Sequence, residues 1–197
     1  MKRAIEFMRY LLSLEQQDKH RSVVIFAHSQ GAIIVEHVLE QLNPEECKKL
    51  RVFTFGGGSY IAPGVCHPDS HNFANIMDPV CRIGSSSKQA LALERYYGRK
   101  RGLSDWQICD ELAYREAILM LDSVSPRVIE EYVKQGTKKF EREMKGLQNI
   151  TILDVNPKVG TPHEFTNYQE AVRIAIKKCF TEAHVKRLPL QKSEFYV

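Results

Sequence analysis

A serine lies between two apolar runs near the start of the chain, in the segment VVIFAHSQGAIIV (residues 23–35). A serine hydroxyl can attack a carbonyl when it is exposed at a strained turn, a base takes its proton and N–H groups stabilise the oxyanion. At a sharp turn from strand to helix, the residues two before and two after the serine have to be small, and here they are Ala27 and Gly31. The segment therefore predicts a nucleophile elbow at Ser29, rather than a serine that only caps a helix.

Candidates for the base and for its orienting acid follow in the order that such elbows require, acid before histidine. Asp78 follows the β-rich run in NIMDPV, and His163 follows another in ITILDVNPKVGTPH. The carboxyl ends of parallel strands lie at one edge of a sheet, so we expect these side chains to meet Ser29 there. His163 would take the serine proton, and Asp78 would fix the tautomer of the imidazole and stabilise the imidazolium. The backbone N–H of Gln30, at the helix start, is the expected oxyanion donor.

Each of these assignments has an alternative. Asp78 also fits a turn aspartate, and His163 also fits the start of a helix. Both, however, follow strands whose carboxyl ends should lie at the same edge of the sheet as Ser29. Asp154 ends a strand as well and is the alternative acid, but it lies on the same strand-to-loop segment as His163. His28 adjoins the serine, and we expect its side chain to point away from it.

The sequence favours neither a metal nor a cofactor. The segment CHPDSH offers a small cluster of potential ligands without a second ligand pair at a recognisable spacing, so a surface loop is the simpler interpretation. These residues are Cys66, His67, Asp69 and His71. No G-x-G-x-x-G and no phosphate-binding lysine loop follows a strand, which disfavours a nucleotide-binding domain. The turn FGGGS at residues 55–59 is the one feature in favour of such a domain.

Strand and helix patterns alternate along the chain, which predicts an α/β fold with a mainly parallel four-stranded sheet flanked by helices. The strands are continuous apolar runs, as burial on both faces requires. We expect strands at residues 23–27, 51–55, 72–77 and 149–153, and helices within 1–20, 32–42, 88–97, 106–121, 126–145 and 171–179.

A long stretch without strand signals precedes the last strand and predicts a helical insertion at about residues 85–146. We expect its aromatic residues, among them Trp106 and Tyr114, to pack the insertion onto the sheet, with a pocket lining as the alternative. The chain is expected to form one domain over residues 1–183, followed by a basic tail at 184–197.

The composition excludes several classes of protein. The net charge of +4 is too small to imply nucleic-acid binding, and the basic cluster within residues 95–101 fits a solvated helix end. No apolar run is long enough for a transmembrane helix. The five cysteines are odd in number and scattered, without a CxxC, which favours a reducing and therefore intracellular compartment.

Three segments resemble the α/β-hydrolase superfamily, and most closely the class 3 (fungal-type) lipases: VVIFAHSQGAIIVEHVL, VFTFGGGS and NFANIMDPVCRIG. In that family the elbow serine, the DPV aspartate and a late histidine form the catalytic triad, which implies Ser29, Asp78 and His163 here. The resemblance covers residues 20–84. His163 corresponds to the histidine of the family only by its late position in the chain. Two features depart from the family pattern. Its second glycine after the elbow is Ala32 here, and the helical insertion has no match.

The resemblance implies a partial α/β-hydrolase fold that lacks the N-terminal strands, since one helix precedes the elbow. The loop that supplies the second oxyanion donor in this fold would then be missing, and the nucleophile strand would have an open edge. A longer protein, a partner chain or a second copy at that edge, or loss of catalysis would each account for this. We expect a carboxylic-ester hydrolase that acts on an ester or acyl substrate, such as a lipid, through an acyl-enzyme. The alternative is an inactive module that binds a partner protein or a lipid surface.

Overall fold

The computed structural model describes residues 2–17, 23–80, 87–120, 125–154 and 163–179, so the expected tail at 184–197 lies outside the described residues. The elements are α1 (Lys2–Gln17), β1 (Val23–His28), α2 (Gln30–Leu39), α3 (Pro44–Lys49), β2 (Leu50–Phe55), β3 (His71–Asn75), α5 (Ser87–Lys100), α6 (Asp105–Met120), α7 (Pro126–Lys145), β4 (Ile150–Leu153), the 3-10 helix η1 (Phe165–Tyr168) and α8 (Gln169–Cys179). The expected strands and helices are all present, and α3 and η1 are additional. None of the helices described is long and apolar enough to cross a membrane.

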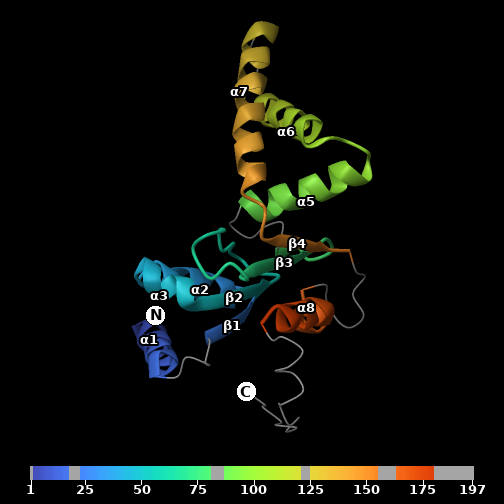
Figure 1. Ribbon diagram of the computed structural model, residues 1–197. Coiled ribbons are helices and arrows are strands. Elements are labelled where there is room, and N and C mark those ends of the chain that lie inside the picture. Colours follow the sequence, from blue (N-terminus) through green and yellow to red (C-terminus); the bar gives the residue numbers. More distant parts are fainter. Residues whose placement is uncertain (1, 18–22, 81–86, 121–124, 155–162, 180–197) are drawn as a thin grey trace.

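The four strands form one parallel sheet in chain order, β1-β2-β3-β4, with helices on both faces (Figure 1). This confirms the predicted fold class, including the helical insertion between β3 and β4. Among the described strands β1 is an edge strand, with β2 as its one neighbour. All four strands run in the same direction, so the residues that follow β1, β3 and β4 are directed toward one edge of the sheet.

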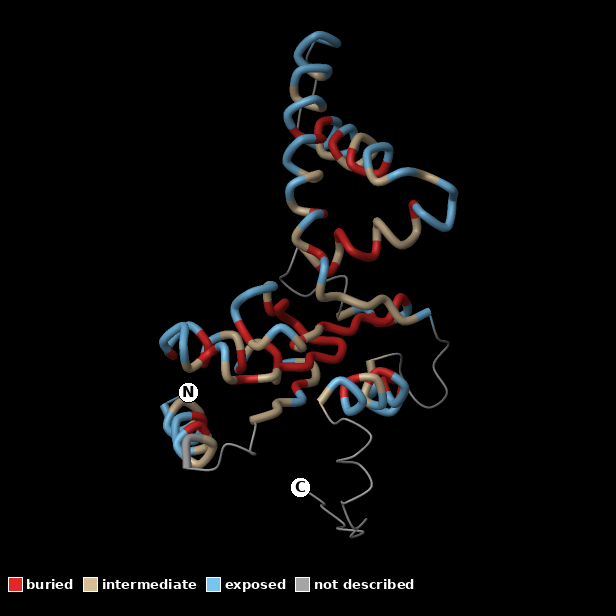
Figure 2. The backbone as a smooth tube through the Cα atoms, in the orientation of Figure 1, coloured by how far each residue is buried: buried red, intermediate tan, exposed pale blue. Residues whose placement is uncertain are grey.

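The alternating side chains of β2 build two separate parts of the core, because successive residues of a strand point to opposite faces. Leu50 and Val52 pack with α1 and α2 on one face, in a cluster that includes Leu12. Phe53 and Phe55 pack with α8 and η1 on the other face. The buried stretch through the centre of the sheet is continuous in Figure 2.

The insertion consists of α5, which lies along β4, and of the helices α6 and α7, which pack against each other and project away from the sheet (Figure 1). Tyr96 and Tyr97 on α5 pack beside Ala74 and Ile76, as expected for residues that hold the insertion to the sheet. Trp106 and Tyr114 do not: they lie on α6 and more than half of each side chain is exposed. The expectation that these two residues pack on the sheet was wrong, because α6 packs on α7; both line a pocket together with residues of α7, which was the alternative.

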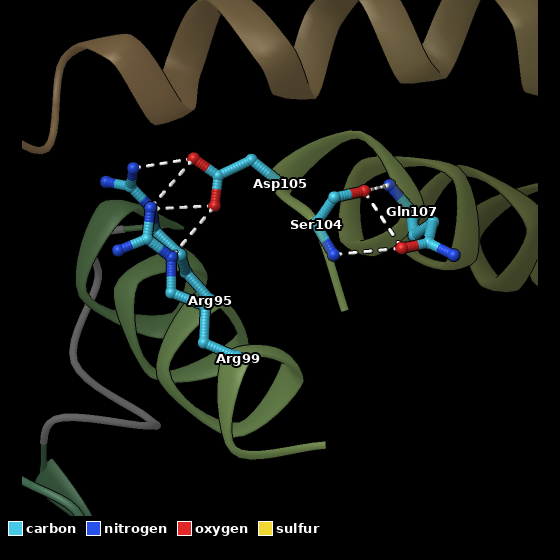
Figure 3. A network of polar contacts seen from close by, with 5 residues as sticks. All are labelled: Arg95, Arg99, Ser104, Asp105 and Gln107. Carbon is cyan, nitrogen blue, oxygen red and sulfur yellow. Dashed lines mark hydrogen bonds and ion pairs between the residues drawn. The ribbon is translucent and has the colours of Figure 1, made fainter. Parts of the chain in front are cut away.

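Charged side chains fix the joint between α5 and α6 (Figure 3). Asp105 accepts hydrogen bonds from Arg95 at 2.6 and 3.1 Å and from Arg99 at 3.1 and 3.2 Å. These arginines, Arg95 first, hold the pKa of the Asp105 carboxyl below its usual value. Ser104 and Gln107 form reciprocal hydrogen bonds at the start of α6, the arrangement of a capping box.

The rest of the basic cluster is also paired with carboxylates. Lys100 bonds to Asp154, and Arg101 bonds to Glu111 at 2.7 Å. Each of the four basic side chains in this cluster thus bonds to a carboxylate, with Arg95 and Arg99 sharing Asp105.

Replacement of Phe53 tests the part of the core beneath η1 and α8. Phe53 is fully buried between β1, β3 and α8, whereas Phe7 on α1 is mostly exposed. We expect Phe53→Ala to lower the free energy of unfolding by about 3–5 kcal/mol, because it leaves a cavity. Phe7→Ala is the matched control and should change it by no more than about 0.5 kcal/mol. Urea denaturation followed by circular dichroism measures both, and equal losses would contradict the described core.

Candidate active site

Ser29 lies at a sharp turn between β1 and α2. Its backbone has φ 55° and ψ −124°, and it is the one residue other than glycine with a positive φ in the described part of the chain. Such a conformation costs about 1–3 kcal/mol and persists only where the surroundings enforce it. Two contacts with the turn after β2 do so: Ser29 N–H donates to Phe55 O at 3.3 Å, and Gly58 N–H donates to Ser29 O at 3.2 Å.

Small residues surround this turn. A Cβ at Gly31 would lie 3.7 Å from the Ala27 methyl group, which is an ordinary van der Waals contact, so the space at Gly31 admits a methyl group. A Cβ at Gly57 would lie 2.6 Å from the methyl group of Ala32, so the turn after β2 needs glycine opposite Ala32. The alanine that departs from the lipase pattern is therefore accommodated by a partner glycine. The Ser29 hydroxyl makes no capping hydrogen bond to α2, which removes the alternative of a helix-capping serine.

The side chains of Ser29, His163 and Asp78 form one chain of hydrogen bonds. His163 Nε2 lies 2.7 Å from Ser29 Oγ, and His163 Nδ1 lies 2.8 Å from Asp78 Oδ2 and 3.0 Å from Asp78 Oδ1. In the tautomer with the proton on Nδ1, His163 donates to the carboxylate and its Nε2 accepts from the serine. Asp78 is fully buried, whereas Ser29 and His163 are partly exposed, so the reactive end of the chain faces solvent.

The carboxylate of Asp78 receives two further donors. The hydroxyl of Tyr168, in η1, donates to Asp78 Oδ2 at 2.5 Å, and the N–H of Val80 donates to Oδ1 at 2.9 Å. Gly56 leaves room for this arrangement, since a Cβ there would lie 2.5 Å from Asp78 Oδ2 and 2.6 Å from the Tyr168 hydroxyl. Tyr168 was not identified from sequence. Because Tyr168 lies 90 residues from Asp78 in the chain, no local sequence pattern links the two residues.

His28 points toward the site, contrary to the expectation from sequence. Its Nε2–H donates to the backbone carbonyl of His163 at 2.8 Å, and the two imidazole rings stack with centroids 4.8 Å apart. The reason is the alternation along β1, which directs Phe26 and His28 to the face that η1 and α8 cover. Burial lowers the pKa of His28 below 6.5, although its bond to the His163 carbonyl opposes this.

Gln30 is the first residue of α2, so its N–H has no acceptor within the helix and lies beside Ser29. In the neighbouring turn, Gly56 N–H donates to Phe73 O at 2.9 Å and Gly58 N–H donates to Ser29 O. The position of the Gln30 N–H is compatible with the oxyanion donor expected from the sequence.

Two exposed aromatic rings lie near the site. Phe26 and Phe165 each keep 44% of their surface exposed. The ring of Phe165 contacts those of His28 and Phe55 at centroid distances of 5.4 and 5.6 Å, and the ring of Phe26 also contacts Phe55, at 5.9 Å. We call these two exposed rings, which share the contact with Phe55, the aromatic shelf.

The alternative acid, Asp154, is held elsewhere. Its carboxylate bonds to Tyr96 and Lys100 on α5, and these two contacts hold its pKa below the usual value. The CHPDSH cluster is also occupied by other contacts: His67 bonds to Arg51 and Asp69, and His71 bonds to Thr151 and Lys178. Within the described ranges no group of three or more metal-ligating side chains comes together.

Tyr168→Phe tests whether the tyrosine supports a buried carboxylate. Hydrogen bonds to charged groups contribute about 1.5–3 kcal/mol, against about 0.5–1.5 kcal/mol for neutral pairs. We therefore expect Tyr168→Phe to lower the free energy of unfolding by more than Tyr60→Phe, whose hydroxyl bonds to Gly146 O at 2.7 Å and Asn149 Oδ1 at 2.6 Å. Urea denaturation of the two variants measures the difference, and a smaller effect at Tyr168 would refute this role.

His71 makes the stability depend on pH. Burial, with a smaller contribution from Lys178, lowers the pKa of His71 from 6.5 to about 4. Between these values the unfolded chain binds a proton that the folded chain does not, so the free energy of unfolding falls as the pH decreases from 6.5 to about 4. His71→Gln should flatten this part of the stability curve, whereas the exposed His37→Gln should not. An unchanged slope in His71→Gln would contradict the burial of this imidazole.

Comparison with known proteins gives one family. Residues 2–80 match the family model described as an alpha/beta hydrolase of unknown function (DUF900). The comparisons with curated proteins and with solved structures gave no match. The matched segment runs from α1 through the elbow at Ser29 to Asp78, and ends before the insertion and His163. Together with the parallel sheet and its flanking helices, this match supports a partial α/β-hydrolase fold.

Proposed function

We propose that this chain is a serine hydrolase that cleaves carboxylic esters through a Ser29–His163–Asp78 triad. The observation that carries the proposal is the strained elbow at Ser29, with φ 55°, from which Oγ lies 2.7 Å from His163 Nε2. Ser29 and Asp78 precede the α5–α7 insertion and His163 follows it. The proposal therefore treats residues 1–183 as one catalytic domain that the insertion interrupts.

The reaction proceeds in two halves. Ser29 Oγ attacks the ester carbonyl while its proton passes to His163 Nε2, and the tetrahedral oxyanion is stabilised by the N–H of Gln30. Collapse of this intermediate breaks the bond to the leaving alkoxide, which takes the proton from His163 and departs as an alcohol. Water then attacks the acyl-enzyme by the same route, His163 acting again as base and then as acid, which releases the carboxylic acid and restores Ser29.

The contacts of each proposed catalytic residue fit the role assigned to it. The carboxylate of Asp78 faces the Nδ1–H of His163 and stabilises the imidazolium that forms during attack. One oxyanion donor, Gln30, supports a slower reaction than two would, since removal of a donor costs about 10²–10³-fold in kcat. We therefore expect slow turnover, for which covalent labelling is a more sensitive assay than product release.

An ester with an apolar acyl group is the substrate class that fits best. The aromatic shelf of Phe26 and Phe165 offers exposed apolar area near the site, and Met77, next to Asp78, is also exposed. The resemblance of the elbow and DPV segments to class 3 lipases supports a lipid ester in particular.

A second candidate function is a hydrolase-like module that binds a partner protein or a lipid surface without catalysis. The exposed apolar side chains on α6, which include Trp106, Tyr114 and Leu119, favour it. The edge strand β1 is another surface at which a second copy or a partner chain could add a strand.

Labelling with a fluorophosphonate probe tests the proposed function. The phosphonate forms a bond to the serine oxygen with loss of fluoride, and it needs the same base as ester cleavage. We expect wild-type protein to be labelled, Ser29→Ala to be unlabelled, and His163→Ala to react at least 10²-fold more slowly, since the base contributes about 10²–10⁴-fold. Ser13→Ala, at an exposed serine on α1, is the matched control and should react like the wild type.

Labelling that survives in Ser29→Ala would contradict the triad. Folded wild-type protein that takes up no label would favour the binding module instead. In that case replacement of Trp106 and Leu119 by serine, rather than replacement of Ser29, should abolish binding to the partner or to lipid vesicles.

A further inference from the structure

We propose that His28 is a positioning residue that holds the backbone and the ring of His163 against Ser29. The inference rests on the proposed function, since it assigns a device that keeps the proposed base in place. It concerns a residue that touches His163 and none of the reacting atoms.

The first observation is a tether between distant parts of the chain. His28 precedes the nucleophile directly, and its Nε2–H donates to the carbonyl oxygen of His163, 135 residues later, at 2.8 Å. This bond fixes His163, whose ring is the proposed base, to His28, which directly precedes the nucleophile Ser29. A displacement of about 1 Å between reacting groups can cost on the order of 10²-fold in rate, so a tether at this point bears directly on proton transfer.

The second observation is ring stacking. The imidazoles of His28 and His163 lie 4.8 Å apart with an interplanar angle of 27°. Phe165 and Tyr168 enclose the His28 ring from η1, at centroid distances of 5.4 and 5.9 Å. Contact on several sides restrains the plane of His28, and through the stack it restrains the plane of His163.

The third observation concerns charge. The titratable groups that face His28 are His163, Asp78 and Tyr168, of which Asp78 already serves His163 through the Nδ1 bond. When His163 accepts the serine proton it becomes a cation, and a second cation stacked on it would oppose that step. Burial, the largest cause, lowers the pKa of His28, so this ring is neutral near pH 7. Protonation of His28 at acid pH would therefore oppose proton transfer to His163.

Two substitutions separate the tether from the charge. His28→Gln keeps an N–H donor at the same reach and removes the titration, whereas His28→Phe keeps a ring for stacking and removes the donor. We expect fluorophosphonate labelling of His28→Gln at pH 8 to be within about fivefold of wild type, and labelling of His28→Phe to be at least tenfold slower than that of His28→Gln. The exposed His37→Gln, on α2, is the matched control and should behave like the wild type.

The pH profile distinguishes positioning from a merely structural role. As the pH falls, the labelling rate of the wild type should decrease more steeply than that of His28→Gln, because protonation of His28 places a positive charge beside His163. Equal labelling of His28→Phe and wild type, or an equally steep decrease in His28→Gln, would overturn the inference.

An NMR measurement of contacts between ring protons makes the inference independent of catalysis. We expect nuclear Overhauser effects between the imidazole protons of His28 and His163, because the two rings stack with centroids 4.8 Å apart. If wild-type protein took up no label, the proposed function would fail, and this measurement would still test the contact. Absence of these effects in the folded protein would overturn the inference.

Discussion

The strained backbone of Ser29 is the constraint on which the rest of the site depends. A serine with φ 55° is stable only where neighbours enforce it, and here the enforcement comes from the turn after β2. Phe55 accepts the N–H of Ser29, and Gly58 donates to its carbonyl. The glycines of that turn allow the approach, since a Cβ at Gly57 would collide with Ala32. The FGGGS segment therefore has a structural purpose at the elbow, which accounts for it without a bound nucleotide.

The second requirement is to bring His163 back to the elbow after the chain has passed through the insertion. Parallel strands achieve this, because β3 and β4 end at the same edge of the sheet as β1. Two contacts then fix the returning segment: Tyr168 bonds to the buried carboxylate of Asp78, and His28 bonds to the carbonyl of His163. The partners in each contact come from opposite sides of the insertion. The helices α6 and α7 project away from the sheet and contribute none of these groups.

Local features of the sequence predicted most of the framework. The small residues Ala27 and Gly31 indicated the elbow, because they stand at fixed positions two before and two after Ser29. The alternation of strands and helices predicted the parallel sheet, because buried strands leave continuous apolar runs and helices that pack on one side leave an apolar stripe. The helix α3 was missed, although Asn43 and Glu46 form a capping box whose spacing is visible in the sequence. The roles of Tyr168 and His28 had no such signal, since their partners lie 90 and 135 residues away. The exposure of Trp106 depends on which element α6 packs against. Helix propensity does not determine that packing partner.

In the proposed reaction Ser29 Oγ becomes covalently acylated, and trapping the acyl-enzyme tests this step. The protein is mixed with an activated butyrate ester, quenched with acid within the first turnover and digested, and the peptides are sequenced by mass spectrometry. We predict one butyryl group on Ser29, absent after the same treatment of His163→Ala. A butyryl group on another residue, or ester cleavage without any modified Ser29, would contradict the account.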